Sequence, residues 1–278
     1  MPAPKLKNLT IFILLLANMI LAFMVFPNRA GVRQEENILR QSLCDLYTEQ
    51  GITLVPETII DTVPLFVLEL KENSNSDLQA ATALLGQQLL AEDDSTRYLS
   101  SYRSEIGQCS ISRSGDFSAE LTASKSVRDI TQASRKLLKD MGFIHLPLAE
   151  SHPVQQNTCT VTATQTILDM PIFSGGLTLT WTNDRLVSLN GVFFTGTDTL
   201  MRVSDSSCIS ATDALVSFLE ARYSLGWVGS EVTALRQGYI RSETAAATTV
   251  RLTPVWQLET DTGTFHIHGM TGDVTPVA

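Results

Sequence analysis

The feature that most constrains this chain is an apolar run near its N-terminus. Residues 9–26 read LTIFILLLANMILAFMVF, eighteen residues in which Asn18 is the one clearly polar member of the interior. As a helix the run would be about 27 Å long at about 1.5 Å per residue. That length is just enough to cross the hydrocarbon core of a bilayer. We therefore expect a single transmembrane helix over 9–26.

A cleaved signal peptide is the alternative, because a short basic start before an apolar run fits both kinds of segment. The residues after Phe26, Pro27–Gly31, contain an arginine and no small-x-small cleavage pattern. This favours an uncleaved signal anchor. Basic residues flank the run on both sides and do not decide its orientation. The signal-like layout and the short tail, 1–8, favour a cytoplasmic N-terminus and an extracytoplasmic C-terminal domain, that is, a single-pass protein of the cell membrane.

Asn18 is costly near the middle of a bilayer unless it finds a hydrogen-bond partner. A second transmembrane helix would supply one, and such bonds contribute about 0.6 to 2 kcal/mol. The alternative is a carboxamide that bonds to its own backbone. On the first interpretation, a partner-binding face at helical spacing contains Leu14, Leu15, Asn18, Leu21, Ala22 and Val25.

The composition is typical of a folded, acidic protein. Hydrophobic residues make up 44% and charged residues 18% of the 278 residues, and the formal net charge is −9. Nucleic acid is recognised by clusters of Lys and Arg that neutralise phosphates, so we expect no nucleic-acid partner. The four cysteines, Cys44, Cys109, Cys159 and Cys208, form no CxxC motif. They fit small buried hydrophobic residues, although four cysteines also allow three pairings.

The rest of the chain predicts an α+β fold, with a helical stalk over 27–50 and two antiparallel sheet-plus-helix units over 51–147 and 158–278. Serines begin three candidate helices, at Ser76, Ser126 and Ser210, each followed three residues later by Gln or Asp as in a capping box. Their apolar residues recur at helical spacing, namely Leu78, Ala81, Leu85 and Leu89; Val127, Ile130, Leu137 and Met141; and Leu215, Phe218, Leu219 and Tyr223.

Strands are indicated by apolar residues at alternate positions. One hairpin turns at Asn183-Asp184, with Leu177, Leu179 and Trp181 on one face before the turn and Val187, Leu189 and Phe193 after it. A second hairpin turns at Gly263. No alternation of strand and helix suggests a parallel βαβ unit.

The sequence contains none of the common motifs for nucleophilic catalysis or phosphate binding. There is no credible GxSxG or SxxK site for a serine nucleophile and no glycine-rich phosphate loop. His266 and His268 form an HxH pair, but Phe265 and Ile267 predict that the histidines lie on the solvent side, without a third ligand nearby. We expect no catalytic, cofactor or metal site, and no enzyme.

Several segments resemble the YycH/YycI family, the membrane-anchored regulators of the essential cell-wall sensor histidine kinase of Firmicutes, and YycI in particular. The resemblance rests on 10–21 in the apolar run, on Gly51-Ile52 before Pro56 and Pro64, and on the C-terminal segment 254–274. That last segment, with PVWQL, FHI and TGDV, is also similar to PepSY-like modules.

The resemblance implies a regulator without catalysis that assembles with a sensor histidine kinase and a sister membrane-anchored regulator, largely through transmembrane helices. Asn18 would then lie at a helix–helix contact. The leading hypothesis is therefore a protein that modulates a two-component sensor kinase by protein–protein contacts. The alternative is an extracytoplasmic PepSY-like module that binds a peptide or inhibits a protease and uses its N-terminal helix as a tether.

Overall fold

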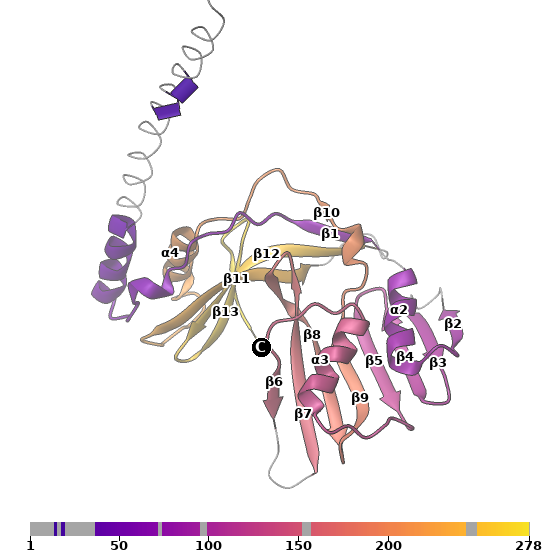
Figure 1. Cartoon of the computed structure of the whole chain (residues 1–278). Helices are drawn as coiled ribbons and strands as arrows, with labels where there is room; N and C mark the ends of the chain where they lie inside the picture. Colours follow the sequence, from indigo (N-terminus) through magenta and orange to yellow (C-terminus); the bar gives the residue numbers. More distant parts are fainter. Residues whose placement is uncertain are drawn as a thin grey trace, which may run out of the picture.

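The computed structural model of the chain describes residues 14–15, 18–19, 37–71, 74–94, 99–151, 157–242 and 249–277. In these ranges most of the chain belongs to one mixed β-sheet of fourteen strands (Figure 1). The strands are β1 (Leu68–Lys71), β2 (Leu90–Asp94), β3 (Leu99–Arg103), β4 (Gly107–Ser112), β5 (Asp116–Leu121), β6 (Ala149–Ser151), β7 (Thr158–Ile167), β8 (Met170–Thr182), β9 (Arg185–Val192), β10 (Met201–Arg202), β11 (Val232–Ser242), β12 (Thr249–Thr260), β13 (Gly263–His268) and β14 (Val274–Pro276).

The sheet has two halves, which meet where β8 runs parallel to β11. The central half contains β2–β9, and the terminal half contains β1 and β10–β14. At the junction Tyr239 pairs with Ile172. Gly238 permits this approach, because a Cβ atom there would lie 2.5 Å from the carbonyl oxygen of Pro171. Glycine in a strand often marks such a close approach of two backbones.

The helices cover opposite ends of the sheet. α2 (Ser74–Leu85) and α3 (Ile130–Asp140) lie over one face of the central half, and α4 (Ala211–Ala221) lies against the terminal half beside a helix over 37–49 (Figure 1). Two short 3₁₀ helices also occur, η1 (Pro56–Thr58) and η2 (Thr197–Thr199). Separate apolar clusters fill the space beneath α2 and α3 and the space beneath α4.

The expectation of two separate PepSY-like sheet-plus-helix units is wrong. Strands from both sides of the expected division share one sheet, because β5 pairs with β9 and β1 pairs with β12. The apolar cluster beneath α2 and α3 likewise takes residues from both sides, such as Phe117 and Leu189. The predicted bounds of the stalk, 27–50, and of the domains, 51–147 and 158–278, stay predictions.

The predicted transmembrane helix over 9–26 is also wrong. In the parts of the chain that the structure describes, no helix is both long enough and apolar enough to cross a bilayer. Of residues 9–26 the structure describes two pairs, 14–15 and 18–19, and the helix at 37–49 has thirteen residues, whereas a crossing needs about 20. The signal anchor and the single-pass location, with a cytoplasmic N-terminus and an extracytoplasmic domain, are wrong for the same reason.

The local signals for helices are confirmed in part. Ser210 caps α4 in a complete capping box with Asp213. The N-cap of α3 is Asp129, which accepts from the backbone amide of Gln132, and not Ser126. α2 begins at Ser74, two residues before the predicted serine.

The predicted hairpin at Asn183-Asp184 is confirmed as β8–β9. Both turn residues have positive φ, 51° and 60°, as a two-residue turn between strands requires. Leu177, Leu179 and Trp181 are buried as expected. Val187 is exposed, because the register shifts between Thr180 and Trp181 and brings Leu186 into the core instead.

Candidate functional site

The predicted partner-binding face near the N-terminus is described in part. Leu14 and Asn18 are helical and their side chains are exposed, Leu14 at 59%. Leu21, Ala22 and Val25 lie outside the described residues. The face therefore stays a prediction.

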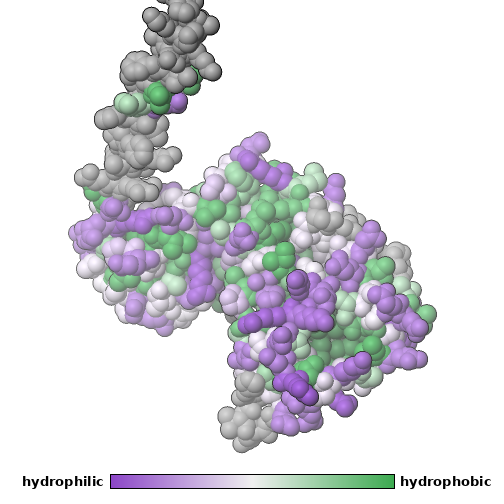
Figure 2. All heavy atoms as spheres, in the orientation of Figure 1, coloured by the Kyte–Doolittle hydropathy of each residue, from purple (hydrophilic) through white to green (hydrophobic). Residues whose placement is uncertain are grey.

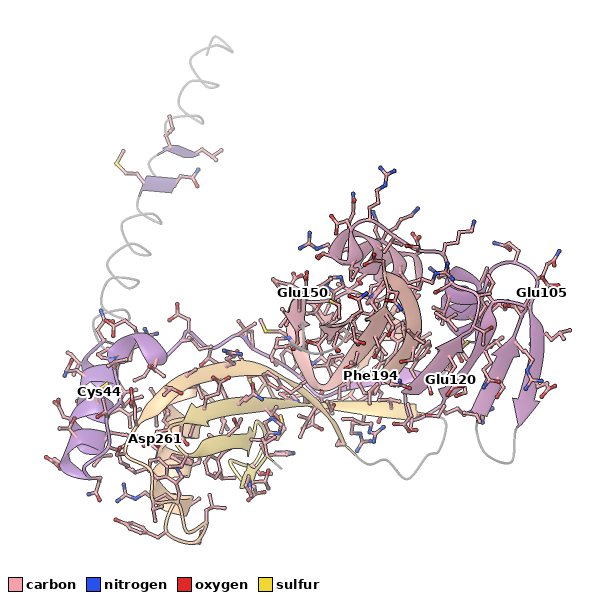
Figure 3. All side chains as sticks on the ribbon, turned by 90° about the horizontal axis from the view of Figure 1, so that it is seen from below. Cys44, Glu105, Glu120, Glu150, Phe194 and Asp261 are labelled. Atoms are coloured by element: carbon pink, nitrogen blue, oxygen red, sulfur yellow. The ribbon has the colours of Figure 1, made fainter. Side chains whose placement is uncertain are left out.

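The helix at 37–49 is fixed firmly to α4. Leu43, Cys44 and Tyr47 are buried against α4, and the hydroxyl of Tyr47 donates to the carbonyl oxygen of Leu215 at 2.7 Å. Burial raises the pKa of Tyr47 far above its usual range, so the hydroxyl stays protonated and keeps this bond. Figure 3 shows Cys44 on this helix, at the same end of the molecule as the β12–β13 turn with Asp261.

A buried cation strengthens the same contact. Arg222, which follows α4, is 6% exposed and donates to the side-chain oxygen of Gln50 at 2.6 Å. Its guanidinium also donates to the hydroxyl of Tyr223 and stacks over that ring. Removal of one partner of a buried charged group is costly, so the end of the 37–49 helix is held in one position.

A groove opens beside this contact, and we call it the N-terminal groove. It has a volume of about 350 Å³ between the 37–49 helix, the segment after η1 and the start of α4. Its lining residues are Leu39, Arg40, Ile59, Ile60, Asp61, Thr62, Ser210, Ala211 and Thr212. Figure 2 shows hydrophobic residues among hydrophilic ones at this end of the molecule.

The N-terminal groove combines exposed apolar side chains with satisfied polar groups. Leu39 is 55% and Ile60 is 38% exposed, and both side chains line the groove. Arg40 forms an ion pair with Asp61 across the groove. The backbone amide of Ala211 donates to the hydroxyl of Thr62 at 2.9 Å. An apolar floor with a charged rim is the arrangement found at protein–protein contacts.

A second surface lies on the central half of the sheet, on the side away from α2 and α3, and we call it the outer face. The strand register places its residues in cross-strand rows, because directly opposite residues point to the same side. One row contains Thr162, Thr178, Asn190, Ser118, Ser110, Ser101 and Glu92. The next contains Thr160, Thr180, Ser188, Glu120, Gln108, Arg103 and Leu90.

At the end formed by β2–β5 the outer face is hollowed into a polar concavity of about 300 Å³. Glu120, on the sheet side away from α3 (Figure 3), accepts from the side-chain amide of Gln108 at 3.4 Å. Arg103 and Glu92 line the same concavity from β3 and β2. Carboxylate, guanidinium and amide groups thus converge on one small space.

The HxH pair lies on the terminal half. Phe265 and Ile267 are buried as predicted, but His266 is half-buried and stacks on Phe173 at 5.7 Å. Burial lowers the pKa of His266. Nδ1 of His268 lies 3.2 Å from the backbone amide of Thr271, which donates to it. Within the described ranges, no group of three or more His, Cys, Asp or Glu side chains is placed to hold a metal ion.

The four cysteines are buried thiols and form no disulfide with one another. Burial raises the pKa values of Cys44 and Cys159, and it raises that of Cys109 to about 12. A thiol of this kind is protonated and a poor nucleophile. The interpretation of the cysteines as small buried hydrophobic residues is confirmed, and the three possible pairings are wrong.

Neither surface was among the sites predicted from the sequence. The N-terminal groove unites 39–40, 59–62 and 210–212, and no pattern links segments so far apart. The outer face has a partial signal, because threonine occupies alternate positions in 158–164 and 178–182. That alternation shows a solvated face, but the rows depend on which strands pair.

Comparison with known proteins shows a fold and no family. No family model matches the chain, and no curated protein matches its sequence. A crystal structure of an uncharacterized protein from Eubacterium rectale ATCC 33656 is similar, with a TM-score of 0.51 and 11% sequence identity over 77% of this chain and 86% of that chain. At that identity the similarity concerns the fold alone. The resemblance to the YycH/YycI regulators stays a prediction.

Proposed function

We propose that this chain is a non-enzymatic regulatory protein that binds a sensor histidine kinase, together with a sister regulator, and modulates the kinase through protein–protein contacts. The partners follow from the resemblance to YycI. The observation that carries the proposal is the N-terminal groove, where Leu39 and Ile60 expose apolar area beside the ion pair of Arg40 and Asp61.

The setting of the groove suits a regulatory contact. One wall is the 37–49 helix, which is bonded to α4 through Tyr47 and Arg222. A partner segment bound there would contact both helices at once. Little rearrangement is needed on the side of this chain, because the walls are already held in place, and such preorganisation favours affinity.

The occupant that we propose is an amphipathic segment of the kinase. Its apolar side chains would contact Leu39 and Ile60, and its polar ones would reach the rim at Arg40 and Asp61. Apolar side chains near the centre of a protein contact usually contribute most of the binding free energy. A charge placed at either apolar position would therefore remove most of the affinity.

The test uses the full chain and purified full-length sensor histidine kinases from the same organism, each in lipid nanodiscs. Surface plasmon resonance measures binding, and incorporation of labelled phosphate measures kinase autophosphorylation. We expect Leu39→Glu and Ile60→Glu each to weaken binding by about tenfold or more. The matched control is Val228→Glu, because Val228 is 90% exposed and does not line the groove.

Equal binding by the wild type and both groove variants would show that recognition lies elsewhere. Failure of every kinase to bind the wild-type chain would contradict the proposed partner. Asn18→Leu tests the second predicted contact face separately: weakened binding supports that face, and unchanged binding removes it.

A further inference from the structure

The outer face differs from an ordinary solvated sheet face in its chemistry. Antiparallel sheets often expose one face to water, and Lys, Arg, Glu and Asp are among the residue types most often exposed on protein surfaces. Among the outward-facing residues of the two rows named above there is no lysine, and Arg103 is the one cation. Uncharged hydroxyl and amide groups occupy most positions instead.

The register makes these groups periodic. Thr162 lies opposite Thr178, and Thr178 lies opposite Asn190. Adjacent strands are about 4.8 Å apart, so hydroxyl or amide groups recur at that interval across the strands. The hydroxyl of Ser118 donates to the side-chain oxygen of Asn190 at 2.9 Å, which shows that neighbouring groups of a row are oriented to exchange hydrogen bonds. A ligand with repeated hydroxyl groups meets matching donors and acceptors along such a row.

The charges in the polar concavity oppose an anionic ligand, because two carboxylates stand against one guanidinium. Glu92 and Glu120 face Arg103 in the polar concavity, and the whole chain carries a formal charge of −9. A polyanion would be repelled by both. Carboxylates instead accept hydrogen bonds from neutral hydroxyl groups, and bonds to a charged group are stronger than those between neutral groups. The amide of Gln108 and the guanidinium of Arg103 supply donors beside them.

From the rows and the concavity together we infer that the outer face binds a neutral polysaccharide. The polar concavity holds one sugar unit through Glu120, Gln108 and Arg103, and the threonine rows of β7 and β8 contact further units of the same chain. No aromatic side chain occurs in the two rows, so each unit binds weakly and affinity grows with chain length, as for any multivalent ligand. This site is independent of the N-terminal groove and goes beyond the proposed function.

The probes are three soluble neutral polysaccharides, dextran, pullulan and mixed-linkage β-glucan, with glucose as the monomer and dextran sulfate as the polyanion. Affinity electrophoresis of the full chain in gels that contain each polymer measures retardation. We expect retardation by at least one neutral polysaccharide, none by glucose, and none by dextran sulfate.

Variants locate the site. Glu120→Gln combined with Gln108→Leu will weaken retardation by about tenfold or more, and Thr180→Lys will weaken it along the threonine rows. Glu105→Gln is the matched control, because Glu105 is an exposed carboxylate on the β3–β4 turn (Figure 3) that does not line the concavity. Thermal unfolding checks that each variant is folded.

With the wild type and the outer-face variants, three results would each overturn the inference: no retardation by any of the three neutral polymers, equal or stronger retardation by dextran sulfate, or unchanged retardation in both outer-face variants. Leu39→Glu separates this site from the groove. It retains polysaccharide binding if the two surfaces act independently, and its loss of retardation would show that the outer face is not the site.

Discussion

The side chain of Gln237 pairs with the backbone of Val63, 174 residues away, in both directions. Its amide nitrogen donates to the carbonyl oxygen of Val63 at 2.7 Å, and its oxygen accepts from the amide of Val63 at 2.9 Å. The same nitrogen lies 3.0 Å from Sγ of Cys208. This one buried side chain therefore fixes the segment that leads from the N-terminal groove into β1.

We expect Gln237→Leu to lower the free energy of unfolding by about 2 kcal/mol, because it removes the partners of two backbone groups. Chemical denaturation with guanidinium chloride measures the change. Gln132→Leu, an exposed position on α3, is the control and should stay close to the wild type. A loss for Gln237→Leu no larger than that of the control would show that the pair contributes nothing.

Helix α3 offers a test of its N-cap. Asp129→Ala will destabilise the protein by about 1 kcal/mol, since the carboxylate accepts from the amide of Gln132 at 2.8 Å. Ser126→Ala, at the cap position that the sequence predicted, will have little effect. The same denaturation experiment compares the two variants, and a larger loss at Ser126 would reverse the assignment.

The contrast between these two residues shows what the sequence could predict. Local signals worked where partners are close in the chain: the capping box of Ser210, the turn at Asn183-Asp184, and the burial of Phe265 and Ile267. Each of these depends on residues within a few positions of one another, and periodicity records such relationships.

Long-range pairing could not be predicted in this way. The contact of β8 with β11 depends on Gly238 and Pro171, 67 residues apart, and nothing in either strand's alternation specifies the other. The apolar pattern of a strand is similar whether the strand pairs within one large sheet or belongs to the sheet of a separate unit. For this reason the expected division into two units is wrong. The N-terminal groove and the outer-face rows also depend on long-range contacts, so the sequence did not predict them.

The half-buried His266 predicts a pH dependence. Burial holds its pKa below the usual value, so at acidic pH the unfolded chain binds a proton more readily than the folded one. Stability from this group is fully present above about pH 6.5 and is lost as the pH falls from there through the folded pKa. Thermal unfolding at a series of pH values should therefore show a smaller acid-induced fall for His266→Gln than for the wild type. Identical falls would contradict this role.

The burial of the four cysteines predicts a low reactivity of their thiols in the folded protein. Because Cys44, Cys109 and Cys159 are buried with raised pKa values and Cys208 is also buried, the native protein will react with Ellman's reagent at mildly alkaline pH far more slowly than the unfolded chain. All four thiols will react in denaturant without prior reduction. Fewer than four reactive thiols in denaturant would reveal a disulfide and contradict the structure.

Hydrogen–deuterium exchange on the full chain, with and without the sensor kinase that binds it, tests directly whether the N-terminal groove contacts the kinase. We expect slower exchange on binding in peptides that contain 39–40, 59–62 and 210–212, the segments that form the N-terminal groove, and unchanged exchange at the β3–β4 turn around Glu105. Protection confined to other segments, with the groove exchanging in the complex as fast as in the free chain, would show that the kinase does not bind in the groove.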